Sequence, residues 1–192
     1  MRQKDNIKLL YIDLFCGAGG TSTGVEKATF HGDKCAKVIA CVNHDANAIA
    51  SHAANHPDAI HYTEDIRTLD LTSLVMHTMH MRLSHPYAHL VLWASLECTN
   101  FSKAKGGMPR NADSPATIQI KEFMALYGIA DIRMRMLRIP ELKRIMGFPE
   151  DYTLIGTQAE QKKFIGNAVE VNMARVLCEA LCKRLNQKKQ AI

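Results

Sequence analysis

The residues best suited to chemistry form two short runs, each directly after a predicted strand. The first, FCGAGG at 15–20, follows the apolar segment KLLYIDL at 8–14, which contains the carboxylate of Asp13. Glycines let the backbone approach a ligand closely, and free N–H groups at a helix start suit a nucleotide-like cofactor. The run lacks the last glycine of GxGxxG and the Lys of a phosphate-binding loop. The sequence therefore favours a ligand with an adenosyl group but no pyrophosphate. A plain tight turn between strand and helix is the alternative.

The second run, LECTNFS at 96–102, follows the apolar segment HLVLWA at 89–94. Cys98 therefore lies at the predicted carboxyl end of a buried strand, where doubly wound folds hold their ligands. A nucleophilic thiolate needs nearby positive charge or a helix start, and the neighbouring Glu97 works against it. On these residues alone, a structural cysteine is favoured over a nucleophile.

Other polar residues follow the remaining predicted strands, at 37–42 and 59–62. Asp45 lies where doubly wound folds place a ribose contact, and Asp65 follows the third strand. Either aspartate could instead cap a helix. His52 and His56 have the i,i+4 spacing of a metal pair, but the Glu of HExxH is absent and the six cysteines form no CxxC. We therefore predict no metal site.

Strands alternate with predicted helices along the first half of the chain, at 21–30, 45–55 and 69–83. This alternation is typical of a parallel, doubly wound α/β sheet. Further on, PELKRIM at 140–146 predicts a short helix, and 168–185 a longer one. That longer helix should bury Met173 and Val176 among others on one face, while Cys178 and Cys182 share a face as small hydrophobes.

Length and composition fit one soluble globular domain, because the 192 residues are 47% hydrophobic and 22% charged. No apolar run is long enough to span a membrane, and the first residues lack the features of a signal peptide, so we expect a cytoplasmic protein without membrane contact. The net charge of +5 and the basic run at 133–144 fit a nucleic-acid partner.

Four segments together resemble the DNA cytosine-5 methyltransferase family. They match, in the family's order, its cofactor-binding first motif, its catalytic loop, and its ninth and tenth motifs: DLFCGAGGTSTG at 13–24, ECTNFSKAKGG at 97–107, RIPELKRIMGFPEDY at 138–152 and FIGNAVEVNMARVL at 164–177. The resemblance covers 8–114 and 130–185. It implies the Rossmann-like fold of S-adenosylmethionine-dependent methyltransferases, here with an incomplete sheet, and a restriction-modification enzyme of bacterial or phage origin.

What the resemblance implies is methyl transfer from S-adenosyl-L-methionine to carbon 5 of a cytosine flipped out of double-stranded DNA. Cys98 would be the nucleophile that activates the ring. Phe15 would stack on the adenine, Asn43 takes the place of a ribose-binding Glu, and Asp65 would hold the adenine amino group. The implied cofactor-binding residues are Asp13, Phe15, Cys16, Gly17, Gly19, Gly20, Asn43, Asp45, Asp65, Ile66, Asn167 and Val169.

The chain also departs from the family pattern. Leu96-Glu97 replaces the usual Pro-Pro before the cysteine, although a Glu there resembles a known variant. Only 42 positions separate Cys98 from Pro140, whereas one βαβ unit alone takes about 30 residues. The family's ENV and QxRxR motifs and its target-recognition domain are not found there, and IQIKEF at 118–123 cannot supply ENV.

We therefore expect a shortened methyltransferase domain in three parts. Residues 1–114 would carry the cofactor site and catalytic loop, 115–129 a short connection where the central motifs are missing, and 130–192 the ninth and tenth motifs. Such a chain could be a degenerate gene product, a mobile-element remnant, half of a split enzyme, or a short variant that takes the missing motifs from a second protein chain. The alternatives are a catalytically dead S-adenosylmethionine-binding module that acts through a partner, and a Rossmann-like oxidoreductase.

Overall fold

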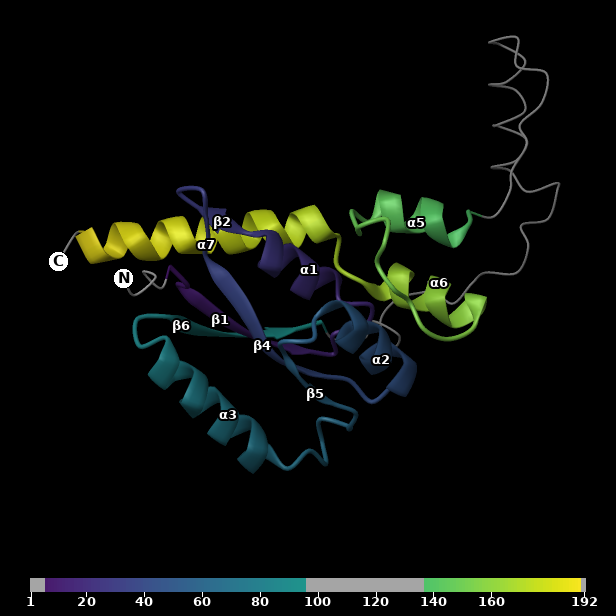
Figure 1. Ribbon diagram of the computed structural model, residues 1–192, viewed down its shortest axis with the longest axis horizontal. Helices are drawn as coiled ribbons and strands as arrows, with labels where there is room; N and C mark the ends of the chain where they lie inside the picture. The colour runs from purple at the N-terminus through teal and green to yellow at the C-terminus, as the bar shows by residue number, and fades with distance from the viewer. Residues whose placement is uncertain (1–5, 96–136, 191–192) are drawn as a thin grey trace, which may run out of the picture. The chain divides into compact units, whose positions relative to one another are not determined.

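Four parallel strands form the sheet that positions the predicted site (Figure 1). The computed structural model describes residues 6–95 and 137–190, with side chains to 187. Residues 6–95 and 138–190 belong to one compact unit. The sheet order is β5-β4-β1-β6, from β1 (Leu9–Leu14), β4 (Ala36–Val42), β5 (Ile60–Tyr62) and β6 (His89–Ala94). All four predicted strands and the α/β class are confirmed. The predicted connection at 115–129 lies outside the described residues.

The order of the strands creates a reversal at β1. Helix α1 (Gly20–Lys27) leads to β4 on one side of β1, and α2 (Ala46–Asn55) continues to β5. Helix α3 (Leu71–Ser84) then returns the chain to β6, which pairs with the other side of β1. Ligands of doubly wound folds bind at the carboxyl ends of strands beside such a reversal. The end of β1 is therefore the expected binding edge.

Side chains of β1 alternate between two apolar layers. Leu9 and Tyr11 pack in the layer that includes α1 and α7 (Val171–Gln190), while Leu10 and Ile12 pack in the layer beneath α3. Figure 1 shows α1 and α7 together on one face of the sheet and α3 on the other. Both faces of β1 are covered, which explains its continuous apolar sequence.

Helix α1 is shorter than the sequence predicts. It is capped by Gly19 rather than by Thr21 or Ser22, and it ends at Lys27 instead of near residue 30. An antiparallel hairpin of β2 (Thr29–Phe30) and β3 (Asp33–Lys34) follows. Its two-residue loop, His31-Gly32, has positive φ at both positions, as a type I′ hairpin turn requires.

Three helices form the second described segment. The short helix α5 (Ile139–Ile145) confirms the prediction at 140–146. Helix α6 (Gln158–Asn167) was not predicted; it begins with a capping box between Thr157 and Glu160. Because Ala168 is extended after α6, α7 starts at Val171 and not at residue 168.

The buried face of α7 differs from the predicted one. Val171, Ala174, Cys178 and Cys182 are buried, whereas Met173 is 56% exposed and Val176 and Leu177 are also exposed. The shared face of Cys178 and Cys182 is confirmed. The physical reason for the difference is the contact with α1, which fixes how α7 is rotated. Among the described residues, no helix combines the length and the apolar character needed to cross a membrane.

Gly24 sets the distance between α1 and α7. A Cβ built at Gly24 would lie 2.6 Å from Ala174 Cβ and would also collide with the carbonyl oxygen of Val171. We predict that Gly24→Ala destabilises the fold by about 1–3 kcal/mol in urea unfolding, because overpacking outweighs the better helix propensity of alanine. Gly166→Ala is the matched control: a Cβ there meets nothing within 4 Å, so stability should stay unchanged or rise. Equal effects of both substitutions would contradict this account of the interface.

Candidate functional site

The turn after β1 has the backbone shape that a close ligand approach requires. Phe15, Gly17 and Gly19 all have positive φ, at 60°, 50° and 80°. The Phe15 N–H donates to the carbonyl of Val42 at the end of β4 (2.8 Å), and the Gly19 N–H donates to the carbonyl of Cys16 (2.9 Å). The turn is thus fastened to the edge of the sheet before α1 begins.

The segment from the tenth motif closes this turn from the other side. A Cβ at Gly20 would collide with the carbonyl oxygen of Val169 and would lie 3.2 Å from Ala168 Cβ. The structure therefore brings Gly20 against Val169, which is far from it in the sequence. Asn167, at the end of α6, is exposed.

Asp13 is buried behind the turn. Its Oδ2 accepts a hydrogen bond from Ser22 Oγ at 2.8 Å, while its Oδ1 has no hydrogen-bond partner among the described residues. Burial raises the pKa of Asp13 to about 7, although the Ser22 bond opposes that rise. The carboxylate therefore ties the end of β1 to the first turn of α1.

Cys16 points inward from the same turn, toward Cys41 on β4. A hydrogen bond between the two thiols lowers the pKa of Cys41 and raises that of Cys16, because the Cys41 sulfur is the acceptor. His52 of α2 lies beside them, and burial lowers the pKa of its imidazole, which favours the neutral ring.

The polar residues after β4 lie next to the turn. Asn43 is largely buried, and its Oδ1 accepts from the Asp45 N–H at 2.9 Å. Asp45 caps α2, since its Oδ1 accepts from the N–H groups of Asn47 and Ala48 at 3.0 and 3.2 Å. Of the two uses that the sequence leaves open for Asp45, the helix cap is observed, and the cofactor contact stays a prediction.

Asp65 lies beyond the end of β5. Its carboxylate accepts from Arg67 Nε at 3.0 and 3.1 Å, and this bond holds the pKa of Asp65 at about 2. An adenine amino group would have to share this acceptor with Arg67. Ile66 packs against the core beneath α3. Cys98 lies outside the described residues.

Tyr152, which sequence reasoning missed, joins the ninth motif to the turn. Its hydroxyl donates to the carbonyl of Ala18 at 2.6 Å and lies 3.4 Å from His56 Nε2. His56 in turn lies 3.2 Å from Thr23 Oγ1 on α1, and its Nδ1 is 3.5 Å from Glu26. The sequence does show a tyrosine at the end of FPEDY. It does not show which group the tyrosine hydroxyl contacts, because Ala18 is far away in the sequence.

These side chains also border a hollow of about 310 Å³ between α1, α2 and the segment after α5. None of the predicted cofactor residues lines it, so it is separate from the predicted site.

Within the basic run at 133–144, Lys143 Nζ donates to the carbonyls of Glu150 and Tyr152, and Arg144 pairs with Glu150. Both cations thus hold the segment that carries Tyr152.

The fold and the glycine turn define a Rossmann-like methyltransferase domain, and comparisons with known proteins agree. Residues 9–112 and 109–183 match the family described as C-5 cytosine-specific DNA methylase. The chain belongs to this family. Its members use S-adenosyl-L-methionine as methyl donor.

Individual relatives match part of the chain. Type II methyltransferase M1.HphI of Haemophilus parahaemolyticus is 33% identical over 124 residues, which are 64% of this chain and 30% of that protein. M.AgeI of Thalassovita gelatinovora is 41% identical over 59 residues, 31% of this chain and 12% of that protein. This chain thus spans less than a third of the length of these curated relatives.

One solved structure shows the fold alone. Methyltransferase EhMeth of Entamoeba histolytica is 12% identical, with a TM-score of 0.56 over 93% of this chain and 99% of that chain.

Tyr152→Phe tests the link between the ninth motif and the turn. The substitution leaves the buried carbonyl of Ala18 without this donor, which should cost about 1–3 kcal/mol of unfolding free energy. Tyr87→Phe is the control, because Tyr87 is 83% exposed and its loss of a hydroxyl should change stability by less than about 0.5 kcal/mol. Urea unfolding monitored by circular dichroism measures both, and a Tyr152→Phe variant as stable as the parent would refute the link.

Proposed function

We propose that the turn after β1 binds S-adenosyl-L-methionine and that the chain acts in methylation of cytosine in DNA. The observation that carries the proposal is the turn itself: three residues with positive φ at the reversal point of the sheet, closed by the segment around Val169. Such a turn leaves backbone open to a ligand where nucleotide-like cofactors bind in this fold.

The start of α1 supports a role in holding the charged end of the cofactor. Gly19 caps the helix without a side chain, so no side-chain oxygen occupies the first N–H groups of α1. Those groups attract a carboxylate, such as that of the methionine part. Phe15 offers a ring for the adenine, and Asn43 an amide for the ribose hydroxyls, with Asp65 and Ile66 on the adenine side and Asn167 near the methionine.

The proposed reaction depends on Cys98. Its thiolate adds to C6 of the flipped cytosine, and the resulting enamine attacks the sulfonium methyl through C5, releasing S-adenosylhomocysteine. Loss of the C5 proton then expels the thiolate and restores the ring. The proposal covers the chemistry of a whole methyltransferase, of which this chain holds a part.

The motifs that the sequence lacks bear on specificity. Contacts to the DNA backbone confer no sequence preference, and the family's recognition domain is not found between Cys98 and Pro140. Within the described ranges, β6 pairs only with β1, and its Leu92 is 63% exposed. Among the described residues this side of β6 has no neighbouring strand, and we propose that a second chain supplies the missing motifs there.

Calorimetry with S-adenosyl-L-methionine tests the cofactor site. Phe15→Ala should weaken binding by about 5- to 150-fold, because loss of a base–aromatic stack costs about 1–3 kcal/mol. Tyr87→Ala, an exposed aromatic away from the turn, should bind as the parent does. Unchanged affinity in Phe15→Ala refutes the placement of the adenine, and binding of NAD in place of S-adenosyl-L-methionine would favour the oxidoreductase.

Trapping on DNA that contains 5-fluorocytosine tests the nucleophile. Fluorine cannot leave as a proton does, so the expected result is a covalent protein–DNA adduct that forms only with S-adenosyl-L-methionine and is absent in Cys98→Ser. Cys178→Ser is the control for a buried cysteine elsewhere. Cofactor binding without any adduct, alone or with a partner chain, would favour the catalytically dead binding module.

A further inference from the structure

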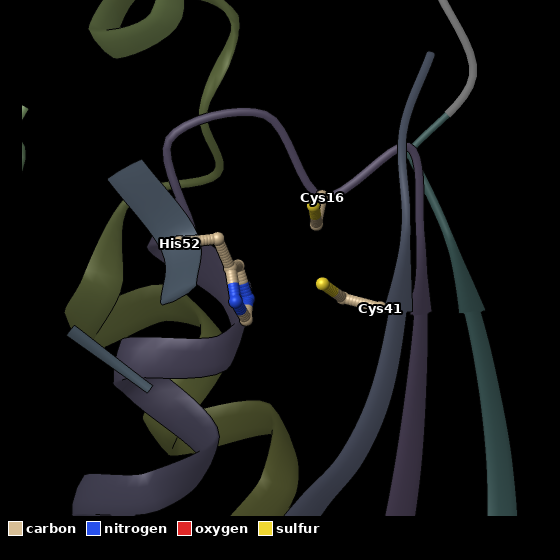
Figure 2. Close-up of side chains that lie close together, drawn as sticks. All are labelled: Cys16, Cys41 and His52. Carbon is tan, nitrogen blue, oxygen red and sulfur yellow. The ribbon is translucent and has the colours of Figure 1, made fainter. Parts of the chain in front are cut away.

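A buried cluster of metal-ligating side chains lies beneath the cofactor turn. Cys16 comes from the turn, Cys41 from β4 and His52 from α2, and their exposed fractions are 6%, 0% and 0%. One donor atom from each lies within 4.8 Å of the other two. Figure 2 shows the side chains of Cys16, Cys41 and His52 around one space between the turn, β4 and α2. The proposed function uses the backbone of this turn but not these side chains.

The spacing of the donors suits a tetrahedral ion. Zinc binds sulfur at about 2.3 Å and nitrogen at about 2.0–2.1 Å, which places two sulfur ligands about 3.8 Å apart and a sulfur and a nitrogen about 3.6 Å apart. Donors that already lie within 4.8 Å of one another need only small side-chain movements to reach these separations.

The hydrogen bonds of His52 are compatible with the tautomer that can bind a metal through Nδ1. The Ser22 hydroxyl donates to Asp13 Oδ2, so its oxygen accepts from His52 Nε2 at 2.9 Å. This bond leaves the lone pair of the neutral ring on Nδ1. Metal-binding histidines are commonly held in this way, with the second ring nitrogen donating toward a carboxylate. Here Ser22 connects the ring to Asp13.

A fourth donor faces the same lone pair. His61 Nε2 lies 3.0 Å from His52 Nδ1, close to the separation of about 3.3 Å for two nitrogens on a tetrahedral zinc. His61 is half-buried on β5 and also interacts with Cys41, but it does not belong to the group of donors that all lie within 4.8 Å of one another, so its ring has to move to become a ligand.

An unpaired acceptor provides independent support for a cation. Asp13 Oδ1 is buried without a hydrogen-bond partner among the described residues, and Asp13 interacts electrostatically with both Cys16 and Cys41. A buried carboxylate oxygen without a partner calls for an explanation, such as a bound ion.

We propose that Cys16, Cys41 and His52 bind a thiophilic divalent cation, Zn²⁺, with His61 as the fourth ligand. Two Zn–S bonds form as the two thiols release their protons to solvent, and His61 then carries its own proton on Nδ1. The ion would join the cofactor turn to β4, α2 and β5. It takes no part in methyl transfer, and it fixes the inner side of a turn whose outer backbone faces the cofactor.

A second cysteine cluster in the described part of the chain offers a comparison. Cys35, Cys178 and Cys182 are also close together, but they lie in an apolar core with Leu9 and Val25, and the cluster includes no imidazole. Small hydrophobic packing accounts for this second group. Removing it therefore gives a control that deletes buried thiols without touching the proposed site.

The test uses the reduced full chain, stripped of metal and then titrated with Zn²⁺ against a chromophoric chelator, both folded and during refolding from urea. We expect one Zn²⁺ per chain, and binding weakened at least 100-fold in Cys41→Ala. Cys178→Ala/Cys182→Ala should still bind one equivalent with parental affinity. Neither readout requires S-adenosyl-L-methionine, so failure here is distinct from failure of the proposed function.

Cobalt substitution keeps the test decisive if Cys41→Ala fails to fold. Co²⁺ in the parent chain should show thiolate charge-transfer absorption and the visible bands of a tetrahedral site, and His61→Gln should alter the visible bands while the thiolate absorption persists. No uptake of either metal by the reduced parent chain overturns the proposal. Uptake that survives Cys41→Ala but disappears in Cys178→Ala/Cys182→Ala overturns it as well.

Discussion

A close backbone contact joins α1 to the chain between 168 and 175, and the candidate site depends on it. At Gly20 and Gly24 there is no space for a Cβ, because the carbonyls of Val169 and Val171 and the start of α7 occupy it. Any larger residue would push the two segments apart. The contact brings the tenth motif against the glycine turn, so one wall of the proposed cofactor pocket is built from residues near both ends of the described chain.

The turn has two sides with different chemistry. Its outer side carries the half-buried backbone of Phe15 and Gly17, both with positive φ. Its inner side rests on a polar chain that runs from Asp13 through Ser22 and His52 to His61. Buried polar groups hold their neighbours in one arrangement, since each unpaired group is costly. The hydrogen bonds on the inner side therefore hold the backbone conformation of the turn. Tyr152 of the ninth motif contributes a further hydrogen bond, to the carbonyl of Ala18.

The sequence predicted those strands and helix starts that depend on residues close together in the chain. Strands buried on both faces read as continuous apolar runs, which is why β1 and β4 were predicted closely. Asp45 before α2 and Pro140 at the start of α5 mark helix starts by their own hydrogen bonding and backbone angle. Helix α6 escaped prediction because only Phe164 and Ile165 of its ten residues are buried, too few to set a helical period.

The sequence by itself determined the α/β class, the four strands, the glycine turn after β1 and the family, because strand burial and motif spelling are local properties of the chain. Only the tertiary structure decided which face of α7 is buried, since the contact with Gly24 and not the apolar pattern sets its rotation. It alone also assembled Cys16, Cys41 and His52. Parallel strands must be joined by crossovers, so residues at the ends of neighbouring strands are distant in sequence, and their meeting cannot be read from spacing.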